Sequence, residues 1–127
     1  MADRRTALAR VRGLGPAREG VAHWWNQRVS ALLLIPLLLW FVARLVQHTG
    51  ADHAAVILWL GHPVTYGTLL VLLGAGFWHA ALGLQVVIED YLHGEVLKLA
   101  LILLARAACL ALFVAAFVSL TVIAFAG

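Results

Sequence analysis

The sequence predicts an all-α membrane protein with three transmembrane helices in one domain over residues 1–127. Hydrophobic residues make up 64% of the 127 residues, and the mean hydropathy is +0.97. Such a composition leaves too few polar residues to cover a soluble domain. A helix needs about 20 apolar residues to cross a hydrocarbon layer of about 30 Å. We expect the spans at residues 29–46, 64–91 and 96–125, after an arm of residues 1–28.

The distribution of basic residues predicts the orientation of the chain. Six of the nine Lys and Arg residues precede the first apolar run and Lys98 follows the second, whereas the segment 47–63 and the C-terminal tail have none. Cytoplasmic segments carry the excess of Lys and Arg, so we expect the N terminus inside and the C terminus outside. The net charge of +3 then reflects orientation and not a phosphate-binding surface, and we expect no nucleic-acid partner.

The first span and the segment before it carry few specific signals. Residues 1–20 are rich in Arg and Ala and lack the apolar core of a signal peptide, so we expect a cytoplasmic arm. Trp24 and Trp25 precede the span and suit the headgroup region of a membrane. Pro36 lies inside the span, where neighbouring helices make a proline tolerable, and predicts a kink.

The segment 47–63 is predicted to be the outside loop. It contains His48, His53 and His62, but their spacing matches neither the i, i+4 pattern nor the Cys/His pattern of a metal site. We therefore interpret them as solvated histidines. Cys109 is the single cysteine, so an intrachain disulfide is excluded.

His79 lies deep in the second span and is the first functional candidate. An ionisable side chain in lipid is usually turned toward a protein partner or a metal. Ala75, Gly76 and Gly83 share its helical face, which therefore has little side-chain bulk. This face is either a close helix–helix seam or a slot for the flat face of a porphyrin whose iron His79 ligates. On spacing alone the seam is favoured, because small residues at such spacing are common in membrane helices.

Polar residues follow at the end of the same span. Asp90 and Tyr91 come eleven and twelve residues after His79, which places them about 16–18 Å further along the helix axis near the same face. Arg28, at the mouth of the first span, is expected at a similar level. Its cation suits an anionic partner there, although a basic side chain at an interface also snorkels to water.

The pattern of His79-x3-Gly83 followed by Glu-Asp-Tyr-Leu-His-Gly at 89–94 resembles the second helix of a known family. This family is the hydrophobic membrane anchor subunit, D type, of succinate dehydrogenase (respiratory complex II). The segment His-Trp-Trp-Asn-Gln-Arg-Val-Ser-Ala at 23–31 extends the resemblance to the first helix. The resemblance implies that His79 is an axial ligand of haem b, with Gly83 in the haem slot. It also implies that Arg28 lies near the haem propionates and the quinone pocket.

The same resemblance implies a complete functional assignment. Tyr91 and Asp90 are expected to form part of a ubiquinone site at the cytoplasmic membrane boundary. The expected partners are a second membrane anchor subunit (C type), an iron–sulfur subunit, a flavoprotein subunit and phospholipid, in a bacterial inner membrane. Since only one histidine lies at depth, the second axial ligand of a low-spin haem is expected from the second anchor subunit. The chain is then a component of succinate dehydrogenase and not a catalyst alone.

Two other functions also fit the sequence, and Arg106 has two possible environments. The chain could be a structural anchor of the same complex without haem, or a small proton or solute transport subunit with a relay of His79, Asp90 and Arg106. Arg106 lies inside the third span, where a charge costs at least about 2.5–3.5 kcal/mol on insertion scales. It either snorkels to the cytoplasmic face, which we favour, or pairs with a haem propionate or a carboxylate of another subunit.

Overall fold

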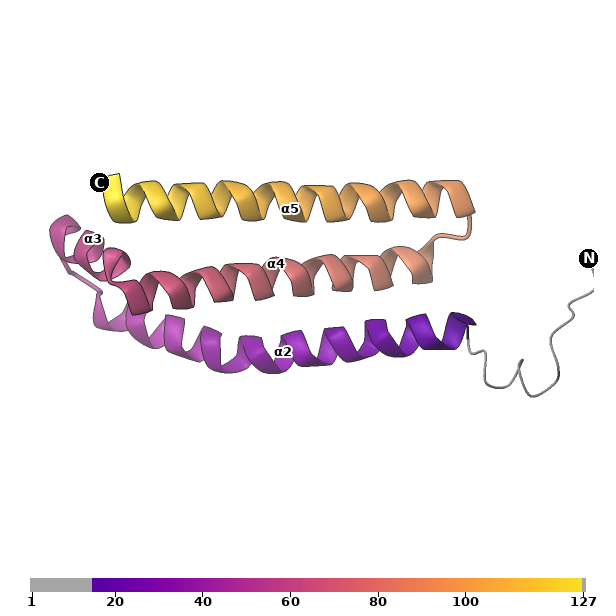
Figure 1. The fold of residues 1–127 in the computed structure, drawn as a ribbon, viewed down its shortest axis with the longest axis horizontal. Helices are drawn as coiled ribbons and strands as arrows, with labels where there is room; N and C mark the ends of the chain where they lie inside the picture. The colour runs from indigo at the N-terminus through magenta and orange to yellow at the C-terminus, as the bar shows by residue number, and fades with distance from the viewer. Residues whose placement is uncertain (1–14, 127) are drawn as a thin grey trace, which may run out of the picture.

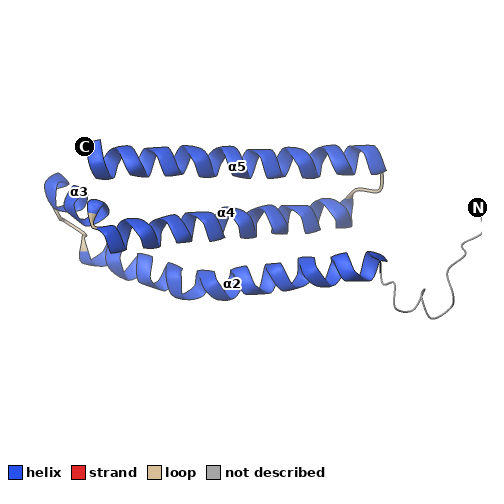
Figure 2. Cartoon of the chain, viewed as in Figure 1, coloured by secondary structure: helices blue, strands red, loops and turns tan. Residues whose placement is uncertain are grey.

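A computed structural model describes residues 15–126, which form four helices and no strand (Figure 2). The helices are α2 (Gly15–Gln47), α3 (His53–Gly61), α4 (Pro63–Tyr91) and α5 (Glu95–Ala126). Within this range, α2, α4 and α5 are long and apolar enough to cross a membrane. The predicted all-α fold with three spans is confirmed, and the orientation stays a prediction.

The three long helices form an open layer with α4 in the middle (Figure 1). α4 packs against α2 on one side and against α5 on the other, and within the described residues α2 and α5 do not approach each other. The short helix α3 packs on α4 and α5 at the end where the chain also terminates. The start of α2 and the α4–α5 turn lie at the opposite end, which we call the N-side end.

α2 begins earlier than the predicted first span. Its helical conformation starts at Gly15, directly before Pro16, and proline is favoured in the first turn of a helix because its missing N–H has no helical partner there. Residues 15–28 of the expected arm are therefore helical, and residues 1–14 lie outside the described residues. The helix continues through Pro36 and curves along its length (Figure 1).

A helix also occupies part of the predicted outside loop. Gly50 adopts a φ of 82°, a left-handed conformation that glycine tolerates. Asp52 then caps α3, because its carboxylate accepts a hydrogen bond of 2.8 Å from the N–H of Ala55. The His48 ring stacks on Trp59 with 4.4 Å between ring centroids. These contacts fold the segment back over the ends of the long helices.

Polar and aromatic contacts join α4 to α5. Tyr66 and Thr121 share a hydrogen bond of 2.8 Å, and the Thr121 hydroxyl donates to the Phe117 carbonyl. Since a hydroxyl has one proton, Tyr66 is the donor to Thr121. Phe77 and Phe113 meet edge to face nearer the middle of the pair, with ring centroids 6.4 Å apart.

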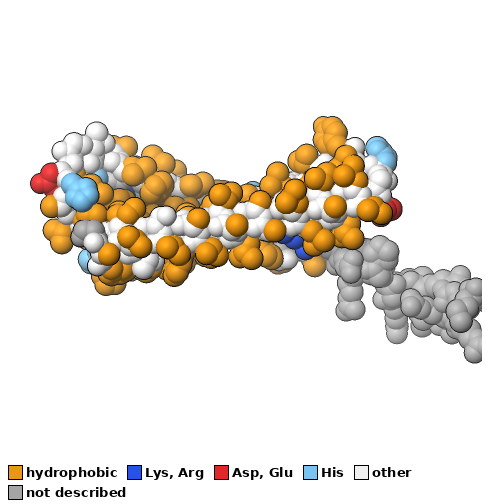
Figure 3. All heavy atoms as spheres, turned by 90° about the horizontal axis from the view of Figure 1, so that it is seen from above, with side chains coloured by type: hydrophobic (Ala, Val, Ile, Leu, Met, Phe, Trp, Pro, Cys, Tyr) orange, Lys and Arg blue, Asp and Glu red, His pale blue; other side chains and the backbone are white. Residues whose placement is uncertain are grey.

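Most of each helix surface is left uncovered by the rest of the chain. Only 6–11% of the residues in the apolar window of each spanning helix are buried. Hydrophobic side chains cover most of the length of the face shown in Figure 3, and acidic side chains gather at its two ends. Such surfaces need a hydrocarbon environment or the apolar surfaces of other subunits.

Gly61 provides a test of this packing. A Cβ at Gly61 would lie 2.9 Å from the Ala124 carbonyl oxygen, so a side chain must push the end of α3 away from α5. We expect Gly61→Ala to destabilise the protein by about 1–3 kcal/mol, measured by thermal unfolding in detergent. Gly67→Ala is the matched control, because a Cβ at Gly67 meets nothing within 4 Å. Equal stability of the two variants would contradict the close contact.

Candidate functional site

A groove of about 350 Å³ lies between the first half of α2 and the second half of α4, toward the N-side end. We call it the α2–α4 groove. It is lined by Gly20, His23, Trp24, Gln27, Arg28, Ala31, His79 and Val86. The sequence candidates His79 and Arg28 therefore belong to one site. Trp24, Arg28 and Val86 are exposed, so the described residues leave one side of the groove open.

His79 is held in the groove by a hydrogen bond to α2. Its Nδ1 lies 2.9 Å from the Oγ of Ser30, and Ser30 is among the most buried residues of the chain, with 6% of its surface exposed. The Ser30 hydroxyl also donates to the Gln27 carbonyl at 3.1 Å. Within the described residues no hydrogen bond forms at Nε2 of His79. One ring nitrogen is therefore engaged by protein and the other is free of protein partners.

The glycines near His79 differ in their surroundings. A Cβ at Gly83 would lie 3.7 Å from the side-chain Nε2 of Gln27, whereas a Cβ at Gly76 would meet nothing within 4 Å. Gly83 therefore lies in the seam between α2 and α4, and Gly76 lies on an open part of α4. The position of Gly83 agrees with a helix–helix seam, and the slot for a porphyrin stays a prediction. His79 bonds across the seam and also lines the groove.

Two further polar groups of the groove have no protein partner in the part of the chain that the structure describes. Nε2 of His23 and Oε1 of Gln27 are buried and unpaired. A buried polar atom without a partner is unfavourable by about 1–3 kcal/mol, so these atoms favour a polar ligand, a water or another chain in the groove. Gln27 was not among the predicted site residues. Its position three residues before Ser30, on one face of α2, is a signal that could have found it.

Arg28 is exposed at the rim of the groove. Its guanidinium carbon lies 5.3 Å from the ring centroid of Trp24, a cation–π arrangement, and Trp24 stacks on Trp25 with centroids 6.1 Å apart. Among the described residues Arg28 forms no ion pair with Asp90. The guanidinium keeps donors available for an anionic group that enters the groove.

Asp90 and Tyr91 are the last two residues of α4. They lie at the same end of the layer as the α2–α4 groove (Figure 1). Tyr91 is 79% exposed, and neither residue is among those that line the α2–α4 groove. The described residues therefore leave the Tyr91 side chain largely uncovered.

Arg106 has a partner that neither sequence interpretation named. Its Nη2 donates a hydrogen bond of 2.6 Å to Oε1 of Gln85 on α4, and Nε2 of Gln85 donates to Oε1 of Glu89 at 2.7 Å. The neutral amide thus links an intramembrane cation to a carboxylate one turn nearer the N-side end. These two hydrogen bonds offset part of the free-energy cost of placing the Arg106 charge in lipid. The i, i+4 spacing of Gln85 and Glu89 indicates only the contact within α4 and not the bond of Gln85 to Arg106.

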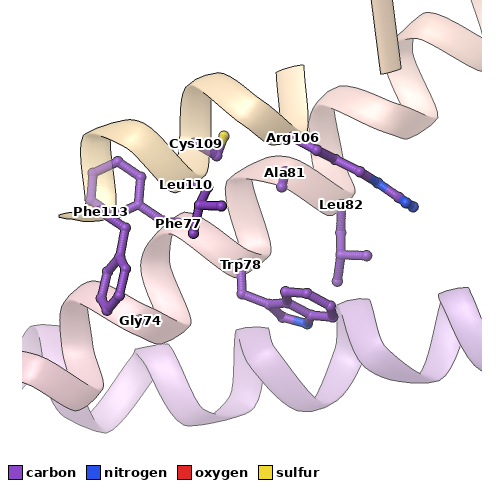
Figure 4. A pocket seen from close by; sticks show the side chains of 9 residues that line it. All are labelled: Gly74, Phe77, Trp78, Ala81, Leu82, Arg106, Cys109, Leu110 and Phe113. Carbon is purple, nitrogen blue, oxygen red and sulfur yellow. The ribbon is translucent and has the colours of Figure 1, made fainter. Parts of the chain in front are cut away.

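A second cavity, of about 450 Å³, lies between α4 and α5 beside Arg106. Its other lining is almost wholly apolar and includes Phe77, Trp78, Leu82 and Phe113 (Figure 4). The Arg106 side chain extends away from the aromatic end of this cavity. Arg106 lines this cavity, whereas the predicted haem and quinone residues His79, Arg28, Gly83, Asp90 and Tyr91 do not.

The geometry bears on the alternative relay of His79, Asp90 and Arg106. In the described part of the chain, Arg106 bonds to Gln85 and His79 bonds to Ser30, so these three side chains form no continuous path. The same residues contain no group of three His, Cys, Asp or Glu side chains suited to a metal ion. A haem iron differs from such an ion, because it needs only axial ligands from protein.

Comparison with known proteins identifies a family over nearly the whole chain. The family described as succinate dehydrogenase/fumarate reductase transmembrane subunit matches residues 2–124. The succinate dehydrogenase hydrophobic membrane anchor subunit of Rickettsia bellii is 33% identical over 101 residues, 80% of this chain and 81% of the relative. That of Rickettsia conorii is 30% identical over 119 residues, 93% of this chain and 94% of the relative.

A third relative, the succinate dehydrogenase hydrophobic membrane anchor subunit of Paracoccus denitrificans, is 32% identical over 90 residues, 71% of this chain and 70% of the relative. No solved structure matches the chain. The three apolar helices make it a multi-pass membrane protein, and a bacterial inner membrane fits the Rickettsia relatives. The resemblance read from the motifs at 23–31 and 79–94 is confirmed. The chain belongs to the succinate dehydrogenase/fumarate reductase transmembrane subunit family, as a membrane anchor that associates with the other subunits of the complex.

Proposed function

We propose that this chain is the anchor that supplies one axial ligand of haem b and part of the ubiquinone site in succinate:quinone oxidoreductase. The observation that carries the proposal is the state of His79 in the α2–α4 groove. Nδ1 is bonded to Ser30, and Nε2 has no partner among the described residues. A histidine that ligates a metal through one nitrogen usually donates its other N–H to protein, so this arrangement supports a ligand role.

The residues around His79 fit a haem. Gly83, one helical turn from His79, adds no side chain to the seam, where a Cβ would lie 3.7 Å from Nε2 of Gln27. The exposed guanidinium of Arg28 can bond a propionate carboxylate. When bound, the haem would supply a one-electron carrier in the membrane. His79 would hold the iron, and Arg28 would orient the group at the rim.

The open side of the groove supports a shared site. A low-spin haem takes two axial ligands, and His79 is the only histidine within the three predicted spans, since His23 of the groove precedes the first of them. The second ligand and the missing wall of the groove would come from a second anchor subunit. The uncovered apolar surfaces of the three spanning helices would meet that subunit and phospholipid.

Tyr91 and Asp90 are proposed to form part of the ubiquinone site. The exposed Tyr91 phenol can donate a hydrogen bond to a quinone carbonyl, which polarises it and favours the charge that develops on reduction. Asp90 would orient these donors and lie on the path of the protons that quinone reduction takes up. The iron–sulfur subunit, docked beside the flavoprotein subunit, would cover this end and deliver the electrons of succinate oxidation.

A structural anchor without haem is the second candidate. It is favoured by the hydrogen bond between His79 and Ser30, which by itself gives an intramembrane histidine a partner. In that case His79 is part of the helix seam only. The visible spectrum of the purified complex separates the two functions, because only the first produces a b-type signal that depends on His79.

The haem assignment predicts the effect of His79→Ala. The variant lacks one axial ligand, so the b-haem absorption of the purified complex should be lost or shifted to that of a different ligand state. Immunoblotting of membranes and of the purified complex should still detect the subunit. A bis-histidine spectrum identical to that of the unmodified complex would show that His79 does not ligate the haem.

The position of Gly83 in the seam predicts that a larger side chain at this position impairs haem content or complex assembly more than a small one. Leucine at Gly83 would press on Gln27 and on α2, so Gly83→Leu should reduce haem content or complex assembly. Gly83→Ala is the matched control, because its Cβ would make an ordinary contact at 3.7 Å. Full haem content in both variants would mean that this face tolerates bulk and does not border the haem.

The quinone assignment predicts the effect of Tyr91→Phe, which removes only the hydroxyl. Succinate:quinone activity should fall at least tenfold, since a lost hydrogen bond to a developing charge costs about 1.5–3 kcal/mol. Succinate oxidation with an artificial acceptor that bypasses the membrane should stay near normal. Equal loss in both assays would indicate failed assembly. Unchanged activity in both would return Tyr91 to the aromatic belt of the interface.

A further inference from the structure

We propose that Ser30 is a positioning residue for His79: it selects the ring tautomer that leaves Nε2 free and sets the orientation of the imidazole in the α2–α4 groove. This inference rests on the proposed function, because it concerns how this chain prepares a histidine for haem iron. It assigns a role to a residue that the motif analysis left without one.

The tautomer follows from counting protons. The Ser30 Oγ has two contacts, the Gln27 carbonyl oxygen at 3.1 Å and Nδ1 of His79 at 2.9 Å. A carbonyl oxygen only accepts hydrogen bonds, and a hydroxyl has one proton to donate. Both contacts are hydrogen bonds in one assignment only, in which Ser30 donates to Gln27 and accepts from Nδ1–H of His79. In a neutral imidazole the proton on Nδ1 leaves a lone pair on Nε2, which is the electron pair that an iron ion binds.

The orientation of the His79 imidazole follows from the positions of Ser30 and His79 on two different helices. Ser30 is on α2 and His79 is on α4, so their bond crosses the seam between two helices that pack along their length. The terminal torsion of a histidine side chain has broad minima, and one bond at Nδ1 removes much of that freedom. Only 6% of Ser30 is exposed, so water has little access to compete for the bond.

The bond also has an electronic consequence for a bound metal. A hydrogen bond from the far N–H raises the basicity of the ligating nitrogen. A more basic ligand favours the ferric over the ferrous ion, because the higher charge gains more from donated electron density. Loss of the Ser30 hydroxyl should therefore make the haem easier to reduce and weaken its attachment.

The test compares the purified complex carrying Ser30→Ala with the unmodified complex in a redox titration of the visible haem signal. The expected result is a more positive midpoint potential, together with haem retention that is weaker by roughly tenfold or more, the lower end of the effect of removing such a partner. Ser30→Thr keeps a hydroxyl and should behave like the unmodified complex. Thr65→Ala is the control for a lost buried hydroxyl: Thr65 is 7% exposed and about 21 Å along α4 from His79, so it should leave the potential unchanged.

Ser30→Val covers the case in which the alanine variant fails to assemble, because valine has the shape of threonine without its hydroxyl. A shift in Ser30→Val that is absent in Ser30→Thr supports the inference. An unchanged potential and unchanged haem retention in Ser30→Ala or Ser30→Val would overturn it, even if His79→Ala loses the haem. Failure of the proposed function is distinct: His79→Ala would then keep the haem spectrum, whatever the serine variants do.

Discussion

Polar side chains inside a hydrocarbon layer have no water to bond with, and this constraint explains the cross-helix contacts of the chain. Each buried polar group of the spanning helices would be unfavourable by about 1–3 kcal/mol without a partner. Ser30 meets His79 between α2 and α4, Tyr66 meets Thr121 between α4 and α5, and Arg106 meets Gln85. Because α2 and α5 do not touch in the described residues, all three bonds converge on α4, and they set its rotation relative to both neighbours.

The constraint also explains which features of the fold are predictable from the sequence. Span number and helical class depend on the length of apolar runs, which are readable directly, and both were confirmed. The helix α3 was missed because its nine residues fit inside a loop-length segment, and its cap at Asp52 was not used as a signal. The partner of Arg106 was missed because a pairing between helices depends on their relative rotation and shift along the axis, which a periodic pattern within one helix does not contain.

In the candidate site, too, features of a single helix were predictable and contacts between helices were not. His79 was predicted as a functional residue because an ionisable group at depth is rare, and its membership of one groove with Arg28 agrees with the expected arrangement. Its bond to Ser30 was not predicted, since the two residues lie 49 positions apart in sequence. Gln27 and His23 add unpaired buried atoms to the same groove. Their role depends on which side chains of α2 face α4, and the weak amphipathic pattern of an apolar helix does not reveal that.

The two halves of the proposed site also differ in how much of each this chain prepares. His79 is fixed from within the chain, by a buried serine on the neighbouring helix, before any other subunit is present. Tyr91 is 79% exposed at the last turn of α4, with no neighbour among the described residues to direct its hydroxyl. A ligand that stays bound benefits from a preformed contact, whereas a substrate that enters and leaves needs an accessible one. The fixed histidine therefore suits the proposed resident haem, and the exposed tyrosine suits the proposed exchange of quinone.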